Sequence, residues 1–142
     1  MDGQGGGNAQ VFFSQLHGLT FKDASRIATL VARAGEEYFE LDSVASALEE
    51  NKKSYLAKLV LEYMDAGVAG SKPGSTRSLP VSQAEYRAQG DPRFEEYVKN
   101  MVEHRRKANL ARVKYDMGKI YIEMQRSSNA NDRQEMYMTG RQ

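Results

Sequence analysis

The chain of 142 residues contains no cysteine, no tryptophan and only three prolines. The absence of cysteine excludes disulfides, thiolate metal sites and cysteine nucleophiles. No apolar run approaches the roughly 20 residues that a membrane helix needs, and the N-terminal stretch has no apolar core of the signal-peptide type. We therefore expect a cytoplasmic protein without membrane contact.

Recognisable catalytic motifs are also missing. The sequence holds no HExxH, GxSxG, EF-hand or paired metal-ligand pattern. Of the two histidines, His104 lies between Glu103 and Arg105 and fits a polar position on a helix better than a catalytic base. The stretch GSKPGST at 70–76 lacks both the Gly-Lys-Ser/Thr ending and the preceding strand of a phosphate loop. We predict a non-enzymatic protein with no catalytic residue, no metal site and no cofactor.

What remains is an all-α pattern, and we predict a small bundle of four or five helices with one long C-terminal helix. Hydrophobic residues make up 40% and charged residues 27% of the chain, which suits one folded domain with a modest core. The predicted parts are a flexible Gly-rich tail (1–9), an N-terminal helical part (10–66), a loop or linker (67–81) and a C-terminal helical part (82–142). No segment shows a strand pattern that we would defend.

Helix boundaries are predicted from capping residues and glycines. In the N-terminal part, Thr20 is the expected N-cap of a first helix that stops at Gly35. A second helix then runs to Gly67, either unbroken or with a break at 49–53. Ser82 with Glu85 resembles a capping box for a short helix that ends at Gly90.

The longest predicted helix begins at Asp91 as N-cap, with Pro92 in its first position. It should run to about Arg126, because the residues 127–132 that follow have poor helix propensity. There the helix should either fray, or break and restart at Asp132. Whether it continues unbroken is left open by the sequence.

Apolar residues of this helix fall into two stripes. The first follows helical spacing and comprises Phe94, Tyr97, Val98, Met101, Ala108, Ala111, Tyr115 and Ile122. The second has the alternating three- and four-residue spacing of a coiled-coil seam and comprises Leu110, Val113, Met117, Ile120 and Met124. Two stripes are more apolar surface than a small monomer can cover, so we predict a homo-oligomer assembled through the second stripe. The alternative is a compact bundle with the N-terminal helices. Gly118, like its neighbouring alanines, would let a partner backbone approach closely.

Basic residues recur every seven positions along the same helix, and positions seven apart drift only about 20° around a helix. This basic row consists of Arg105, Arg112, Lys119, Arg126 and, if the helix continues, Arg133. Arg106 and Lys114 lie nearby, and Tyr121 offers a ring on which an unpaired base can stack. Evenly spaced cations suit a polyanion or an acidic partner helix.

Charge is unevenly distributed although the net charge is only +1. Between Glu36 and Asp65 there are eight acidic residues against three lysines, and between Arg105 and Arg126 seven basic against two acidic residues. This asymmetry fits either a basic binding face or an acidic segment packed beside a basic one, within or between subunits.

In size, all-helical character and possession of a basic helix, the chain resembles the small helical accessory proteins of phage recombination modules, the recombination mediators. The resemblance is located around EYVKNMVEHRRKANLARVKYDMGKIYIEMQR (96–126) and assigns no functional residue. It implies a protein that binds single strands as an oligomer and helps to load a recombinase.

Two functions are consistent with these features. The leading prediction is an oligomeric nucleic-acid-binding accessory protein, in which single strands are favoured because no groove-reading motif is present. Its predicted nucleic-acid-binding residues are Arg105, Arg106, Arg112, Lys114, Lys119, Tyr121, Arg126 and Arg133. The alternative is a protein-interaction module, such as a virion component, an adaptor or an inhibitor, whose basic row docks on an acidic protein surface.

Overall fold

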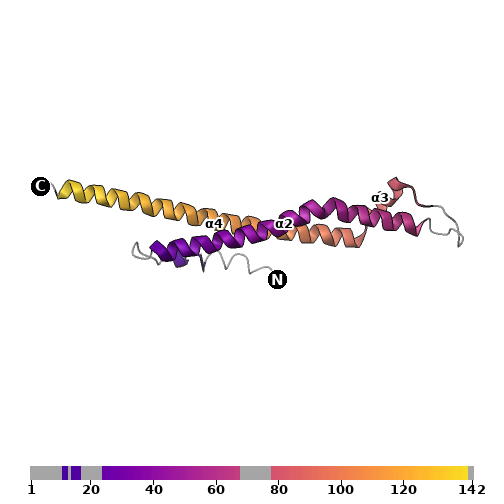
Figure 1. Cartoon of the computed structure of the whole chain (residues 1–142), viewed down its shortest axis with the longest axis horizontal. Coiled ribbons are helices and arrows are strands. Elements are labelled where there is room, and N and C mark those ends of the chain that lie inside the picture. Colours follow the sequence, from indigo (N-terminus) through magenta and orange to yellow (C-terminus); the bar gives the residue numbers. More distant parts are fainter. Residues whose placement is uncertain (1–10, 13, 17–23, 68–77, 141–142) are drawn as a thin grey trace. The chain divides into compact units, whose positions relative to one another are not determined.

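The computed structural model describes residues 11–12, 14–16, 24–67 and 78–140 of the chain. Its elements are α2 (Ala24–Ala66), α3 (Val81–Gln89) and α4 (Pro92–Thr139), and the described residues among 11–16 are also helical (Figure 1). No strand occurs in these described ranges. The predicted all-α class with one long C-terminal helix is confirmed. The predicted Gly-rich tail, the Thr20 cap and most of the predicted linker lie outside the described residues.

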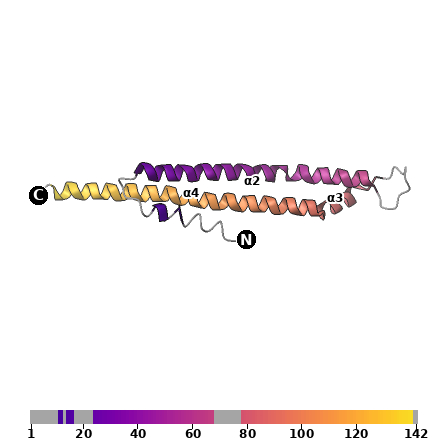
Figure 2. The same cartoon turned by 90° about the horizontal axis from the view of Figure 1, so that it is seen from below.

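Two compact units divide the chain, and each contains part of α2 and part of α4. Unit 1 combines the chain up to Asp42 with the chain from Arg106 onward, and unit 2 spans Ser43–Arg105. In unit 1 the first part of α2 lies antiparallel beside α4, and in unit 2 the last part of α2 lies antiparallel beside the start of α4 (Figure 1, Figure 2). Each unit is therefore organised around one antiparallel helix pair.

The core of unit 1 is formed where α2 and α4 meet a short helical segment. Ile27, Val31 and Ala34 of α2 are buried together with Phe12 and Leu16. From α4, Ala108, Ala111 and Gly118 are buried, and Tyr115 and Ile122 pack against the core. These residues of α4 recur at alternating intervals of three and four, the spacing of a coiled-coil seam. In unit 1 the first predicted stripe therefore forms the contact with α2.

Small residues let the two helices of unit 1 approach closely. A Cβ atom added to Gly118 would lie 3.0 Å from Cγ2 of Val31 and 3.3 Å from Cζ of Phe12. This confirms the close approach that the sequence predicted for Gly118. It also explains why a residue with poor helix propensity is placed inside a helix.

Gly35 does not end a helix, and that prediction is wrong. It lies inside α2, where an added Cβ would be only 2.8 Å from Cε2 of Tyr115. Glycine therefore provides space for the tyrosine ring here and does not stop the helix.

Residues 49–53 do not break α2 either, and the helix continues to Ala66. Gly67 follows with a φ of 71°, a left-handed conformation that glycine adopts without strain, so the predicted stop there is confirmed.

Unit 2 is held together by an aromatic pair and by small buried residues. The rings of Tyr55 and Tyr97 stack with centroids 4.6 Å apart, and the Tyr97 hydroxyl donates a hydrogen bond of 2.6 Å to the carbonyl of Leu48. Ala84 and Ala88 bury one side of α3. The predicted capping box is not formed, because α3 already begins at Val81 and has no side-chain cap. Ser82 lies inside the helix instead.

Helix α4 continues well beyond Arg126, which answers the question that the sequence left open at residues 127–132. The residues 127–132 are helical, and the helix ends only at Thr139. Each poor helix former lowers the stability of a helix by less than about 0.7 kcal/mol relative to alanine. This loss is tolerated because an existing helix gains one backbone hydrogen bond for every residue that it adds. Arg133 therefore belongs to the same helix as the rest of the basic row.

Candidate nucleic-acid interface

The basic row is divided between the two units, because Arg105 is the last residue of unit 2 and the other four cations belong to unit 1. Arg105 donates hydrogen bonds to both carboxylate oxygens of Glu49, at 2.7 and 2.8 Å, and one of 3.2 Å to Oγ of Ser46. This contact keeps the pKa of Glu49 below its ordinary value. The Arg105 charge thus has an acidic partner within its own unit.

Lys114 is similarly engaged, in unit 1. Its ammonium group lies 2.9 Å from Oε2 of Glu37, and its side chain is only 17% exposed. The same group lies 5.1 Å from the centroid of the Phe12 ring. Lys114 therefore joins α2, α4 and the short N-terminal helical segment, and has little surface left for a ligand.

Arg112 and Lys119 share one acidic neighbour on their own helix. Asp116 lies 3.7 Å from Arg112 and 2.9 Å from Lys119, and all three side chains are well exposed. Lys119 also lies over the Tyr115 ring at 4.6 Å, and the contact with Asp116 raises its pKa. Exposed ion pairs of this kind contribute at most about 1 kcal/mol, so a phosphate can compete with Asp116 for either cation.

Arg126 and Arg133 are exposed and form no ion pair with another described residue. Lys107, one turn before Ala111, is exposed in the same way. Arg106 is exposed as well, but it already interacts with another residue. Within unit 1 the accessible part of the basic row therefore consists of Arg112, Lys119, Arg126 and Arg133.

Tyr121 lies in the core region rather than on an open surface. Its hydroxyl donates a hydrogen bond of 2.8 Å to the carbonyl of Leu16 and accepts one of 3.1 Å from Nε2 of Gln125. Its ring packs against the buried cluster of unit 1. A different tyrosine, Tyr137, is 76% exposed on the same helix. Sequence reasoning missed it, although its position four residues after Arg133 places it beside a cation of the row.

The second stripe is open along its whole length. Leu110, Val113, Met117, Ile120 and Met124 are each between 44% and 66% exposed. They lie on a side of α4 that α2 does not cover, because α2 contacts the first stripe. A coiled-coil seam is thus present in unit 1 without a partner helix among the described residues.

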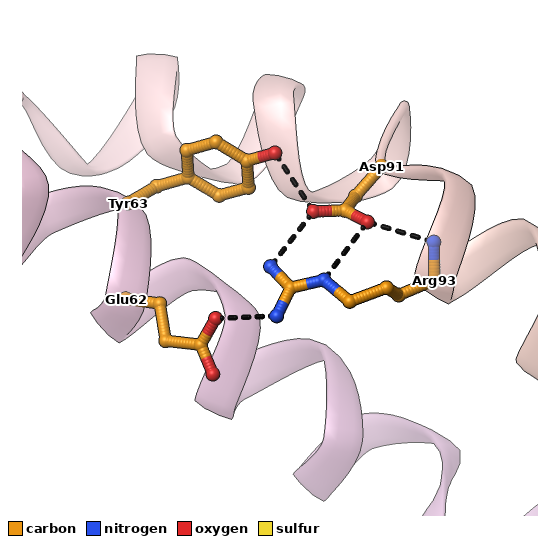
Figure 3. Close-up of polar contacts among 4 residues, drawn as sticks. All are labelled: Glu62, Tyr63, Asp91 and Arg93. Carbon is orange, nitrogen blue, oxygen red and sulfur yellow. Dashed lines mark hydrogen bonds and ion pairs between the residues drawn. The ribbon is translucent and has the colours of Figure 1, made fainter.

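A dense polar cluster in unit 2 is an alternative candidate for a site (Figure 3). Asp91 is buried and accepts hydrogen bonds from the Tyr63 hydroxyl at 2.7 Å and from the backbone N–H of Arg93 at 2.7 Å. The Arg93 guanidinium donates to both carboxylate oxygens of Asp91 and to Glu62 at 2.8 Å. It holds the pKa of Asp91 far below its ordinary value.

This cluster has a structural explanation. Asp91 is the N-cap of α4, as predicted, and Tyr63 and Glu62 belong to the last turn of α2. Both carboxylate oxygens that could act on a substrate are already hydrogen-bonded, and the acid stays ionised. The cluster ties the start of α4 to the end of α2 within unit 2.

Neither His104 nor the acidic residues of the described ranges belong to a group that could bind a metal ion. Nδ1 of His104 lies 2.9 Å from the carbonyl of Asn100 on its own helix. Across the described ranges, no three acidic or histidine side chains are grouped so that they could hold a metal ion. Among these residues there is also no helix with the length and apolar character needed to span a bilayer.

Comparisons with models of protein families, with curated proteins and with solved structures gave no match.

Proposed function

We propose that the chain is a non-enzymatic, oligomeric accessory protein of the cytoplasm that binds nucleic acid, with single strands favoured. The observation that supports this most is the accessible part of the basic row. Arg112, Lys119, Arg126 and Arg133 recur every seven residues, about 10 Å apart along α4, and all four are exposed. Among the described residues, the acidic side chain paired with these four cations is Asp116, which Arg112 and Lys119 share.

Phosphates are the natural partners of such a row. Each contact between a cation and a phosphate releases counterions, so several weak contacts along one helix add up to useful affinity at low salt. A single strand is flexible enough to bring a phosphate to each cation of a straight helix. Duplex recognition usually needs an element shaped for a groove, and no such motif is visible in the sequence.

Self-association is the second part of the proposal. The second stripe would pair with the same stripe of another copy and so remove its five apolar side chains from water. Pairing through α4 would bring basic rows of several copies together, which multiplies the number of phosphate contacts on one strand. The resemblance of residues 96–126 to phage recombination mediators supports the same function. In its more specific form, the proposal is that the chain helps to load a recombinase.

A charge-reversal variant tests the proposal. Arg112→Glu with Lys119→Glu changes two exposed side chains that do not contribute to the core, so helicity should be retained. We expect loss of binding to a labelled single-stranded oligonucleotide at low salt, with an unchanged circular dichroism spectrum. Binding at wild-type strength by a folded double variant would show that the basic row is not the site.

The runner-up is a protein-interaction module, which the open second stripe favours. In that case the stripe would receive an apolar helix of another protein, and the basic row would face acidic residues beside it. The absorbance ratio of the purified protein separates the two functions cheaply, because co-purified nucleic acid raises absorbance at 260 nm and the chain has no tryptophan. A ratio typical of pure protein together with failure to bind any strand would favour the protein partner.

A further inference from the structure

The last turns of α4 present a face that carries a small residue and an aromatic residue beside two cations of the basic row. Arg126, Ala130, Arg133 and Tyr137 follow one another at intervals of four, three and four residues. On an α-helix this spacing places all four side chains on one side. A shallow surface hollow is lined there by Ala130, Arg133 and Tyr137, together with Gln134 and Met138.

Acidic residues of the same segment lie elsewhere around the helix. Asp132 and Glu135 are three residues apart, and each is about a quarter of a turn or more away from Arg133 and Tyr137. The segment therefore separates its charges, with cations and an aromatic ring on one side and carboxylates on the other.

Tyr137 differs from the other tyrosines of α4. Tyr97 is stacked and hydrogen-bonded in unit 2, while Tyr115 and Tyr121 pack in the core of unit 1. Tyr137 is 76% exposed, and no described helix covers it. A large aromatic ring kept in water beside an arginine offers both a π-face and a positive charge.

We propose that this face, formed by Ala130, Arg133 and Tyr137, is a stacking subsite for an unpaired base of single-stranded nucleic acid. The base lies on the Tyr137 ring over the small side chain of Ala130, and the Arg133 guanidinium contacts the adjacent phosphate. This inference rests on the proposed function and adds to it. It assigns the base contact to Tyr137 instead of Tyr121, and it explains a preference for single strands, since paired bases expose no face.

A tryptophan reporter provides the test, because the chain has no tryptophan of its own. Tyr137→Trp places a single indole at the subsite and keeps a flat aromatic surface. Tyr86→Trp is the matched control, because Tyr86 is 81% exposed but belongs to α3 and not to the helix that carries the basic row. Both variants are titrated with oligo-dT and with an abasic strand of equal length and charge.

The expected result is that oligo-dT, but not the abasic strand, quenches the indole fluorescence of Tyr137→Trp, while the fluorescence of Tyr86→Trp changes little with either strand. Tyr137→Ala should bind oligo-dT about 5- to 150-fold more weakly than the wild type, the usual effect of losing one stacked base. If the wild-type chain binds labelled oligo-dT but the fluorescence of Tyr137→Trp does not distinguish the two strands, the subsite is refuted while the proposed function stands. If the wild-type chain binds no strand, both are refuted.

Discussion

Gly35 of α2 faces the ring of Tyr115 of α4 so closely that a Cβ atom on the glycine would lie 2.8 Å from Cε2. The ring of Tyr115 also lies 6.3 Å from that of Tyr38 and 6.2 Å from that of Phe39, measured between centroids. The tyrosine thus fills the groove that the glycine leaves open. This contact fixes how α4 is rotated against α2 in unit 1, and hence which side of α4 is free.

Enlarging Gly35 should therefore destabilise unit 1. Gly35→Leu forces the Tyr115 ring out of its place, and overpacking of this kind costs about 1–3 kcal/mol of the free energy of unfolding. Urea denaturation followed by circular dichroism measures the loss. Ala32→Leu is the control, because Ala32 is exposed on the same helix and a surface change there should stay within about 0.5 kcal/mol. Equal stability of the two variants would contradict the close contact.

Asp91 should make stability depend on pH in the acidic range. Its pKa is lowered in the folded state, chiefly by Arg93 and then by Tyr63. A lowered pKa stabilises the fold above the ordinary aspartate value of 3.8, and this stabilisation is lost as the pH falls below it. The urea midpoint of the wild type should therefore exceed that of Asp91→Asn at pH 6.

The difference between these two midpoints should narrow as the pH falls toward 3. Asparagine can still cap a helix, so the comparison isolates the charge of Asp91 from its role as N-cap. A midpoint difference that stays constant from pH 6 to pH 3 would show that the carboxylate charge contributes nothing to the contact with Arg93.

The second stripe should govern assembly. Met117→Gln with Ile120→Gln makes the middle of the stripe polar without adding charge, and both side chains are already exposed in the single chain. We expect sedimentation equilibrium to show a shift from an oligomer to a monomer with unchanged helicity. Val102→Gln serves as control, since Val102 is 57% exposed on α4 but lies outside the stripe. Unchanged mass of the double variant would exclude assembly through this face.

Members of the basic row should differ in their effect on nucleic-acid binding. Arg105 is held by both oxygens of Glu49, whereas Arg112 has only a 3.7 Å contact with Asp116. Arg112→Gln should weaken binding and reduce its salt dependence, and Arg105→Gln should do so much less. Anisotropy titrations of the two single variants make the comparison. A larger effect of Arg105→Gln would mean that the ion pair with Glu49 opens when a strand binds.

The all-helical class, the two stripes of α4 and the Asp91 cap could be predicted because each depends on local spacing or local chemistry. Helix ends were predicted less well. The propensity of Gly35 alone predicts a helix end, whereas the reason for a glycine at this place in α2 is its contact with Tyr115, which lies 80 positions later in the sequence. Propensity alone predicts a weak point at residues 127–132, but these residues extend a helix that is already formed and are helical themselves.

For the candidate interface, residue spacing defines the position of each cation on the helix but not its neighbours. Spacing treated Arg105 and Arg126 as equivalent, and only the tertiary contacts show that Arg105 is paired with Glu49 while Arg126 is exposed. Tyr121 and Tyr137 were likewise indistinguishable by residue type. The interval of four residues between Arg133 and Tyr137 was the available signal, and it depended on α4 continuing beyond residue 126.

The most direct test of the central claim is the salt dependence of binding to a labelled single-stranded oligonucleotide. If the four accessible cations of unit 1 contact phosphates, log affinity should fall with log salt at a slope of about −3, from about −0.7 for each contact. Arg112→Gln with Lys119→Gln should reduce that slope to about −1.5. A slope near zero, or one that the double variant leaves unchanged, would contradict phosphate binding by the basic row.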